Sequence, residues 1–263
     1  MEIQIKRTVK AGNSSAVVLP RAWLNKEVRV ELVKKTPEMI LFEVINIAKK
    51  YIELKDIIGI YLIGSYARGE EDENSDIDIL IITNKIDKKM INEGIYNLLI
   101  ISSELLRQKL NQDLFPIGQM IKEAEPLLNS EYLDSINVKV TKNNIKWYLE
   151  TTEDKLKIIQ KIIDKIKNNK KKYVDERATY TLILRIRTLY IIKKLMENND
   201  YSKKEFINLI KNISHGIDAY NDYLAVKNNK KSLHKTTLEE IENLHNYLKN
   251  QLAEIKGLLR NKN

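Results

Sequence analysis

Two nearly continuous apolar runs, residues 57–63 and residues 77–82, constrain the fold of this chain more than any other feature. Each run is short and rich in isoleucine, which is typical of a β-strand. The first run leads directly into Gly64-Ser65-Tyr66-Ala67-Arg68-Gly69, and the second opens as Ser75-Asp76-Ile77-Asp78. A mixed acidic segment lies between them. The pattern predicts two strands of a small α/β core, joined through a glycine turn.

Asp76 and Asp78 stand at the start of a strand that is otherwise apolar. Residues i and i+2 of a strand project from the same face, roughly 6.6 Å apart along the chain. Two carboxylates placed in this way repel each other, and they are costly to bury unless a cation lies between them. Such oxygen ligands suit Mg²⁺, which usually keeps waters and substrate phosphates as further ligands. We therefore predict that Asp76 and Asp78 are catalytic residues that hold Mg²⁺.

The turn before them has the chemistry of a phosphate site. Gly64 lets the backbone turn closely, and Ser65 can open a short helix whose N-terminal N–H groups face a phosphate. A phosphate cradle opposite two metal-binding carboxylates is what nucleotidyl transfer needs. We predict that Gly64 and Ser65 position a nucleoside triphosphate, that Arg68 supports it, and that Ser75 completes the nucleotide-binding set.

This arrangement of Gly-Ser and Asp-x-Asp around two apolar strands resembles the DNA polymerase β nucleotidyltransferase superfamily, in its minimal and kanamycin-nucleotidyltransferase-like branch. The resemblance implies Mg²⁺-dependent transfer, most simply of AMP from ATP. The superfamily usually has a third carboxylate on a later strand, and the matching position in the run 95–101 is Asn97. Asn is a poor base and carries no charge. In the kanamycin-modifying relatives the base comes from the C-terminal domain, where Glu150, Glu153 and Glu176 are candidates.

Two functions follow from these residues. The leading hypothesis is an enzyme that moves a nucleotidyl group to an acceptor hydroxyl, and the sequence leaves the acceptor open among a protein, an RNA and a small molecule. The alternative is a DNA-binding regulator or antitoxin whose core binds nucleotide without turnover. Asn97 favours the alternative, whereas the intact pair of Asp76 and Asp78 favours the enzyme.

Residues 1–35 form a separate β-rich unit in this interpretation. Alternation of apolar and polar residues predicts strands at 3–5 and at 28–32, and Gly12-Asn13-Ser14 predicts a turn. A unit of this size cannot bury an adequate core alone, so it should dock on its neighbour or dimerise. The segment from Gly12 to Leu24 resembles the AbrB-type swapped-hairpin DNA-binding domain. That resemblance implies a homodimer and DNA contacts by Lys6, Arg7, Lys10 and Arg21; a docked hairpin without a DNA role is the alternative.

The C-terminal part is predicted to be a bundle of four or five helices. Apolar stripes at helical spacing begin near Asn143, and the segments 202–205 and 236–239 have the sequence of capping boxes. The bundle loosely resembles the substrate domain that follows kanamycin-nucleotidyltransferase-like cores. Arg185 and Arg187 lie on its most apolar segment, where unpaired charge is costly. They either form an ion pair with an acidic helix or face the cleft and bind a phosphate.

Charge supports a division into three modules of an α+β chain. Residues 1–36 carry a net charge of +5, residues 37–140 carry −7, and residues 141–263 carry +11. We predict an AbrB-like unit over 1–35, a nucleotidyltransferase core with a mixed sheet over 36–140, and the helical bundle over 141–263.

The chain has no Cys, which excludes disulfides and Cys-based zinc sites. It has neither a long apolar run nor a signal-peptide pattern, so we predict a cytoplasmic protein without a membrane partner.

Overall fold

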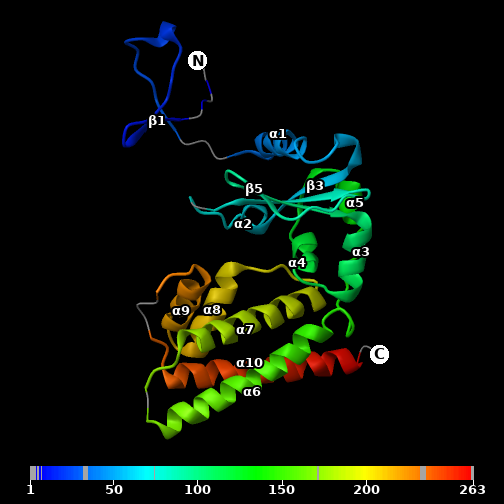
Figure 1. The fold of residues 1–263 in the computed structure, drawn as a ribbon, viewed down its shortest axis with the longest axis vertical. Helices are drawn as coiled ribbons and strands as arrows, with labels where there is room; N and C mark the ends of the chain where they lie inside the picture. The colour runs from blue at the N-terminus through cyan, green and yellow to red at the C-terminus, as the bar shows by residue number, and fades with distance from the viewer. Residues whose placement is uncertain are drawn as a thin grey trace.

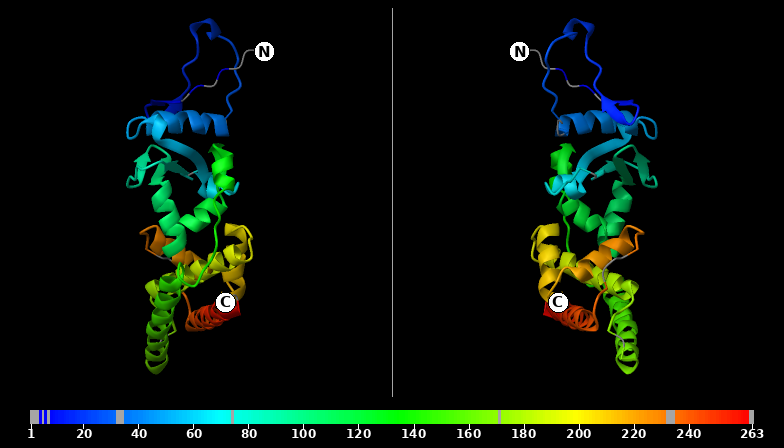
Figure 2. Two further views of the ribbon diagram at one scale, coloured as in Figure 1. Left: turned by 90° about the vertical axis from the view of Figure 1, so that its right-hand side faces the viewer. Right: turned by 90° about the vertical axis from the view of Figure 1, so that its left-hand side faces the viewer.

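The computed structural model describes residues 4, 6, 8–31, 35–73, 75–170, 172–231 and 235–261. Over these residues the chain has the predicted α+β fold: a two-stranded N-terminal hairpin, a five-stranded mixed sheet and ten α-helices. Figures 1 and 2 show the three parts arranged along the long axis of the molecule, with the sheet between the hairpin and the helical bundle. None of the described helices is long and apolar enough to cross a membrane.

The N-terminal hairpin pairs β1 (Val9–Ala11) with β2 (Ser14–Ala16) in antiparallel register. Gly12 adopts a left-handed φ of 63° in the turn, and a short 3₁₀ helix, Arg21–Trp23, follows Pro20. The predicted strand at 28–32 is wrong over its described part, residues 28–31, because no neighbouring strand offers its backbone hydrogen-bond partners. The other predicted strand, 3–5, falls largely outside the described residues.

Helix α1 (Pro37–Ala48) begins with a threonine cap and a proline. The Thr36 hydroxyl accepts a hydrogen bond from the Met39 N–H at 3.4 Å, and proline occupies the first helical position. One apolar face of α1 is buried through Ile40, Val44, Ile47 and Ala48.

The mixed sheet has the strand order β5-β6-β4-β3-β7. Strands β4 and β6 are parallel, and every other neighbouring pair is antiparallel. The two strands predicted from the apolar runs are central in this order. The strands are β3 (Ile57–Ile63), β4 (Ile77–Thr83), β5 (Ile91–Glu93), β6 (Tyr96–Ser102) and β7 (Glu125–Leu128).

Side chains alternate between the two faces of this sheet. Ile77, Ile79 and Ile81 of β4 pack in the apolar cluster that includes α1, whereas Leu80 and Ile82 join the cluster that continues into the bundle. Asp78 therefore projects from the bundle-facing side of the sheet. The short helices associated with the sheet are α2 (Gly64–Ala67), α3 (Ser103–Gln112), α4 (Ile117–Lys122) and α5 (Ser130–Asp134).

Five described helices form the bundle, with α7 to α9 nearer the sheet than α6 and α10 (Figure 1). An apolar stripe of the last helix is buried from Ile241 to Leu259. One of the two hydrogen bonds of the predicted capping box at Ser202 is confirmed: the Ser202 hydroxyl accepts the Glu205 N–H at 3.2 Å. The second box lies one residue later than predicted. The five helices of the bundle are α6 (Lys146–Asn168), α7 (Glu176–Met196), α8 (Lys203–Ser214), α9 (Asp218–Lys227) and α10 (Leu238–Asn261).

The shift of the second box has a local cause. Thr237 and Glu240 exchange the bonds of a capping box: the Thr237 N–H donates to the Glu240 carboxylate at 2.7 Å, and the Glu240 N–H donates to the Thr237 hydroxyl at 3.3 Å. Thr236 is instead buried, and its N–H donates to the Asp222 carboxylate at 2.9 Å. Burial against α9 thus decides which of two adjacent threonines caps α10.

Candidate active site

The ends of three neighbouring strands bring the predicted site residues together. Asp78 of β4 is in register with Ile63, the last residue of β3, and with Asn97 of β6. Gly64 follows Ile63 directly and begins α2. Asp76 is exposed one residue before β4, and Asp78 is half-buried. The site thus lies at one end of the inner strands β3, β4 and β6, on the bundle-facing side of the sheet.

Gly64 is required here by both its backbone and its surroundings. Its φ of 74° is in the left-handed region, and a Cβ at this position would lie 2.5 Å from Asp78 Oδ2. Any side chain at position 64 would therefore displace the carboxylate. The observed position of the Asp78 carboxylate thus depends on the absence of a side chain at Gly64.

Asn97 interacts directly with the candidate metal ligand. Its side-chain amide donates a hydrogen bond from Nδ2 to Asp78 Oδ1 at 3.0 Å. The strand register that places these residues side by side is the one expected if Asn97 occupies the position of a third carboxylate. The amide fixes one oxygen of Asp78 without adding negative charge.

Glu123, the residue that follows α4, was not predicted from the sequence. Its Oε1 accepts the Gly64 N–H at 2.9 Å, and its Oε2 accepts a hydrogen bond from the Arg68 guanidinium at 2.7 Å. Gln119, one turn earlier, donates to the same Oε2 at 3.2 Å. An acidic side chain from α4 is thus hydrogen-bonded to two groups that were predicted to contact a triphosphate.

Arg68 also connects the site to the bundle. Its Nε donates to Glu70 at 2.9 Å, and Glu70 in turn accepts the Lys203 N–H at 2.8 Å and the Ser202 hydroxyl at 3.2 Å. Burial raises the pKa of Glu70, but the bonds from Arg68 and Lys203 outweigh that effect and leave the pKa below its ordinary value. The Glu70 carboxylate therefore sits, ionised, at the N-terminus of α8.

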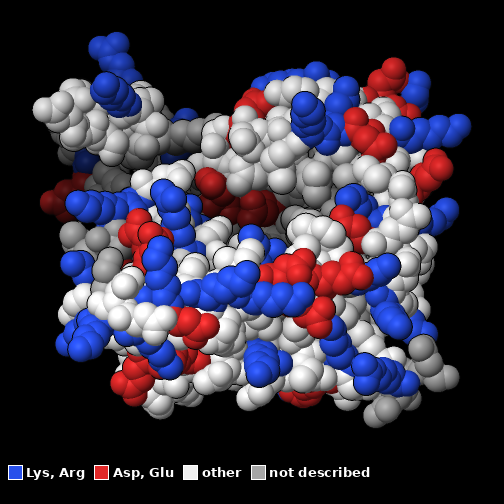
Figure 3. Space-filling model, turned by 60° about the horizontal axis from the view of Figure 1, so that its bottom comes forward, with Lys and Arg blue, Asp and Glu red and all other residues white. Residues whose placement is uncertain are grey.

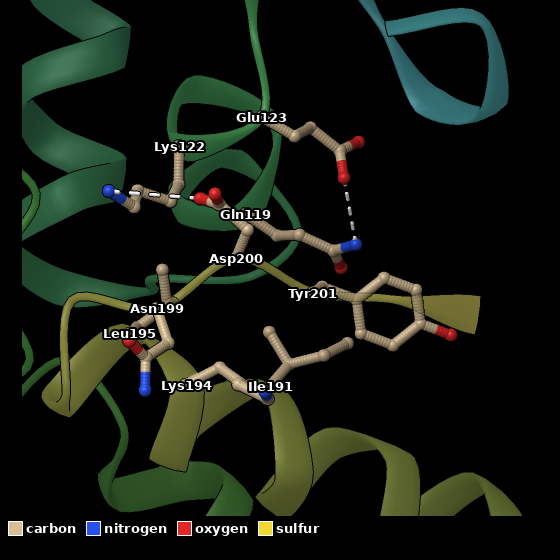
Figure 4. A pocket seen from close by; sticks show the side chains of 9 residues that line it. All are labelled: Gln119, Lys122, Glu123, Ile191, Lys194, Leu195, Asn199, Asp200 and Tyr201. Atoms are coloured by element: carbon tan, nitrogen blue, oxygen red, sulfur yellow. Dashed lines mark hydrogen bonds and ion pairs between the residues drawn. The ribbon is translucent and has the colours of Figure 1, made fainter. Parts of the chain in front are cut away.

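A small pocket lies beside this connection, between α4 and the segment from α7 to α8. Figure 4 shows Glu123 and Gln119 on one side of it, and Tyr201 and Ile191 on the other. The Arg68 guanidinium lies 5.4 Å from the centre of the Tyr201 ring. Residues of the core and of the bundle thus meet directly next to the candidate site.

Other predicted site residues have more local contacts. The Ser75 hydroxyl accepts the Asp72 N–H at 2.8 Å, and the Ser65 carbonyl accepts the Glu70 N–H at 2.9 Å, so both residues shape the turn around the site. The candidate bases are not brought to Asp78. Glu153 pairs with Lys256 on α10, Glu150 lies 3.9 Å from Lys146, and Glu176 is exposed in the first turn of α7.

The predicted DNA contacts lie on the N-terminal unit. Lys6, Lys10 and Arg21 are exposed, whereas Arg7 lies outside the described residues. Large apolar side chains of the same unit are also exposed, including Val18 at 66% and Leu24 at 72%. Among its described residues this unit therefore buries no apolar core of its own.

The donor set around Asp78 fits a hard divalent cation. Asp76 and Asp78 offer carboxylate oxygens, and Gly64 places no side chain against Asp78 Oδ2, which a Cβ there would approach to 2.5 Å. The described residues contain no cluster of three or more acidic or histidine side chains placed to hold a metal ion. A pair of carboxylates is enough for Mg²⁺, because this ion commonly completes its shell with waters and substrate phosphates.

The contact of Glu70 with α8 gives a stability prediction. Glu70→Gln removes charge-assisted bonds to Arg68 and to the Lys203 N–H, so we expect a loss of about 1–3 kcal/mol in urea unfolding at pH 7. Because the folded pKa of Glu70 is lowered, its contribution is present above the unfolded value of about 4.3 and is lost as the pH falls through the folded value. The variant and the parent should therefore converge once the pH lies below this lowered folded pKa.

The exposed Glu73 in the same loop is the matched control, and Glu73→Gln should leave the unfolding midpoint unchanged. Equal midpoints for Glu70→Gln and the parent at pH 7 would contradict a stabilising contact between core and bundle.

The chain is similar to known proteins in sequence and in structure. A family model described as a nucleotidyltransferase domain matches residues 43–207. A nucleotidyltransferase-like protein from Exiguobacterium sibiricum is 13% identical over 82% of this chain and 75% of its own, with a TM-score of 0.38. Spectinomycin adenyltransferase from Enterococcus faecialis, solved with ATP and spectinomycin, is 15% identical over 81% of this chain and 99% of its own, with a TM-score of 0.40. No curated protein matches the chain.

Proposed function

Because this chain belongs to the nucleotidyltransferase domain family, we propose that it transfers a nucleotidyl group, most simply AMP from ATP, to an acceptor hydroxyl. The observation that supports this function best is the junction of β3, β4 and β6. There the carboxylate of Asp78 lies against the left-handed Gly64, where any side chain would displace Asp78 Oδ2. The proposed division of labour places this chemistry in residues 36–140 and acceptor binding in the bundle, residues 141–263.

Each residue of the site has a proposed role. Asp76 and Asp78 would hold Mg²⁺, which supplies charge neutralisation of the transferring phosphoryl group when it is bound. Gly64 and Ser65 position the triphosphate, with Ser75 shaping the turn around it. Arg68 keeps guanidinium N–H groups beyond those used by Glu70 and Glu123, and these are available to phosphate oxygens.

The direct test is a labelling experiment. The full chain is incubated with Mg²⁺, cell extract and ATP, GTP, CTP or UTP labelled at the α-phosphate, and the protein, RNA and small-molecule fractions are then separated. We expect label from one nucleotide in one of these fractions, which would identify both substrates. A chain that binds nucleotide but labels nothing in any fraction would contradict the enzyme.

A second function, a DNA-binding regulator or antitoxin with a non-catalytic core, is favoured by two observations. Asn97 stands where the resemblance implies a carboxylate, and its amide bonds Asp78. The N-terminal unit exposes basic and apolar side chains together. We propose that two copies of residues 1–35 cover these apolar side chains in an AbrB-like homodimer, which would present Lys6, Arg7, Lys10 and Arg21 to DNA.

Asn97→Asp distinguishes the two functions. Without metal, the substitution replaces a hydrogen-bond donor to Asp78 by a like charge, so the melting temperature should fall, and Mg²⁺ should restore it. If the parent is an enzyme with its base elsewhere, the transfer rate should change only modestly. If the parent is a non-catalytic binder, transfer should appear where none existed. Asn84→Asp, at the exposed opposite end of β4, controls for the charge change.

DNA binding by the N-terminal unit has a salt signature. Each phosphate contact releases counterions, so the logarithm of the affinity should fall by about 0.9 per contact for each tenfold rise in salt. The double variant Arg7→Ala and Lys10→Ala should make this dependence on salt shallower, by the equivalent of about two phosphate contacts. Lys55→Ala, in the nucleotidyltransferase core, should not change it. Salt-independent binding, or no binding at low salt, would leave the unit with a packing role only.

A further inference from the structure

Charged side chains on the surface of the helical bundle pair with one another. Figure 3 shows Lys and Arg side chains beside Asp and Glu side chains over one face of the molecule. Ion pairs of this kind join helices of the bundle: Lys193 contacts Glu254 at 2.7 Å, and Lys194 contacts Glu205 at 2.8 Å. Because such pairs are open to water, they contribute little to stability and indicate no ligand.

The ion pair of Glu123 with Arg68 differs from these in its burial. The two side chains are 9% and 15% exposed, whereas Glu205 of the surface pair is 60% exposed. Removing two charges from water is costly, and the cost is offset only where hydrogen bonds satisfy the charged groups in good geometry. The Glu123 carboxylate accepts bonds from Gly64 at Oε1 (2.9 Å) and from Arg68 and Gln119 at Oε2 (2.7 and 3.2 Å). A carboxylate bonded on both oxygens also restrains the groups that donate to it.

Sheet pairing brings Glu123 to this position. Strands β7 and β3 are antiparallel, with Leu62 opposite Glu125. Continued by two residues, this register places position 123 opposite Gly64. The Glu123 side chain accepts the Gly64 N–H where the ladder ends, and its second oxygen reaches the Arg68 guanidinium. A glutamine could still accept the Gly64 N–H, but its other group would be an NH₂ donor that faces the donors of the guanidinium. Both contacts together therefore require a carboxylate.

Three contacts hold the Arg68 side chain. Its Nη1 donates to Glu123, its Nε donates to Glu70 at 2.9 Å, and its guanidinium lies 5.4 Å from the centre of the Tyr201 ring. The Tyr201 ring is contacted in turn by Arg187 of α7, whose guanidinium lies 5.3 Å from the ring centre. An arginine restrained in this way loses little further side-chain entropy when it binds a phosphate, so its contribution to affinity is greater.

Glu123 does not replace the third carboxylate of the family pattern. Within the described ranges no three acidic side chains are placed to hold one metal ion, so Glu123 is not a further ligand beside Asp76 and Asp78. Its two oxygens already accept three hydrogen bonds, and a general base needs a lone pair directed at the proton that it removes. Glu123 can therefore act on the reaction only through the groups that it holds.

We propose that Glu123 is a positioning residue of the nucleotide site, which holds the Arg68 guanidinium and the Gly64 turn in the geometry that receives a triphosphate. This inference rests on the proposed function, because it takes Arg68 as a phosphate contact. The negative charge of Glu123 also repels a triphosphate, but Arg68 lies 2.7 Å away and largely cancels that field. Loss of the carboxylate would leave Arg68 paired with Glu70 alone among the described carboxylates, so the guanidinium would be less restrained. We expect this loss of order to outweigh the relief of repulsion.

The first test measures nucleotide affinity. The full chain is titrated calorimetrically with Mg²⁺ and an ATP analogue that carries a methylene between the α and β phosphorus atoms, because this analogue binds without transfer. We expect Glu123→Gln to weaken binding about tenfold, the equivalent of one charge-assisted contact. Glu125→Gln removes the same charge from an exposed side chain two residues later, so it is the matched control and should bind like the parent. A purely structural role would lower the melting temperature and leave the affinity of the folded chain unchanged.

A double-mutant cycle shows whether the effect passes through Arg68. Arg68→Gln alone should also weaken binding, and the double variant Glu123→Gln with Arg68→Gln should bind no more weakly than Arg68→Gln, because no guanidinium is left to position. Independent contributions would add instead. Gln119→Leu removes one bond to the same oxygen without changing the charge, so it should weaken binding in the same direction by a smaller factor. That variant keeps the proposal testable if Glu123→Gln unfolds.

Three results would overturn the positioning role: an unchanged affinity in Glu123→Gln, a tighter affinity that shows the carboxylate competing with the triphosphate, and additive losses in the cycle. Failure of the proposed function has a different signature. A parent that binds the analogue through coupled Glu123 and Arg68 but labels no acceptor would reject only the enzyme. A parent that labels its acceptor while its affinity does not depend on Glu123 would reject only the positioning role.

Discussion

Replacing Asp78 by Asn is expected to lower the rate of nucleotidyl transfer about a thousandfold. A bound metal contributes several kcal/mol to the stabilisation of a transferring phosphoryl group, and each 1.4 kcal/mol corresponds to about a factor of ten in rate. The substitution removes one of two carboxylates and leaves the strand unchanged in size and shape. It should also abolish the rise in melting temperature that Mg²⁺–ATP gives the parent, because that rise requires binding to the native state.

Asp56→Asn is the matched control for this prediction. Asp56 is half-buried at the opposite end of the same sheet, where it precedes β3. Its replacement should leave both transfer and the thermal shift intact. An Asp78→Asn protein that binds Mg²⁺–ATP and labels its acceptor as well as the parent would overturn the assignment of the site.

The central strands were predictable because their signal is local. The runs 57–63 and 77–82 became β3 and β4 almost residue for residue. The alignment of Asn97 with Asp78 is consistent with the family pattern, because parallel β4 and β6 fix that register. Local hydrophobic patterning and capping chemistry are enough for predictions of this kind.

The contacts that complete the site were not predictable in the same way. Glu123 reaches Gly64 and Arg68 across 59 and 55 positions of sequence, and no periodicity or motif around Glu123 indicates this. Glu70 reaches Lys203 across 133 positions. These contacts depend on how α4 and α8 dock on the sheet, which is a property of packing over long distances in the sequence.

The N-terminal unit shows a different limit. Alternation at Val28 and Val30 predicted a strand, yet both side chains are exposed and the segment is unpaired within the described chain. A strand needs a neighbour to satisfy its backbone, and alternation alone does not say whether that neighbour belongs to the same chain. The proposed homodimer would supply one.

Gly64→Ala is expected to reduce transfer on the order of a hundredfold while the chain stays folded. The new Cβ would lie 2.5 Å from Asp78 Oδ2, so the carboxylate must move, and a displacement of about 1 Å at a reacting centre costs rates of this order. The left-handed φ of 74° adds strain of roughly 1–2 kcal/mol, which lowers stability as well.

Gly69→Ala separates these two effects. Gly69 closes the same turn with a φ of 63°, but a Cβ added there would have no atom within 4 Å, so the substitution brings backbone strain without a clash. Both variants should therefore lose similar stability in urea unfolding, and only Gly64→Ala should lose transfer and the thermal shift with Mg²⁺–ATP. Equal activity in the two variants would mean that the position of Asp78 beside Gly64 does not matter to the reaction, since the strain is shared and only the contact differs.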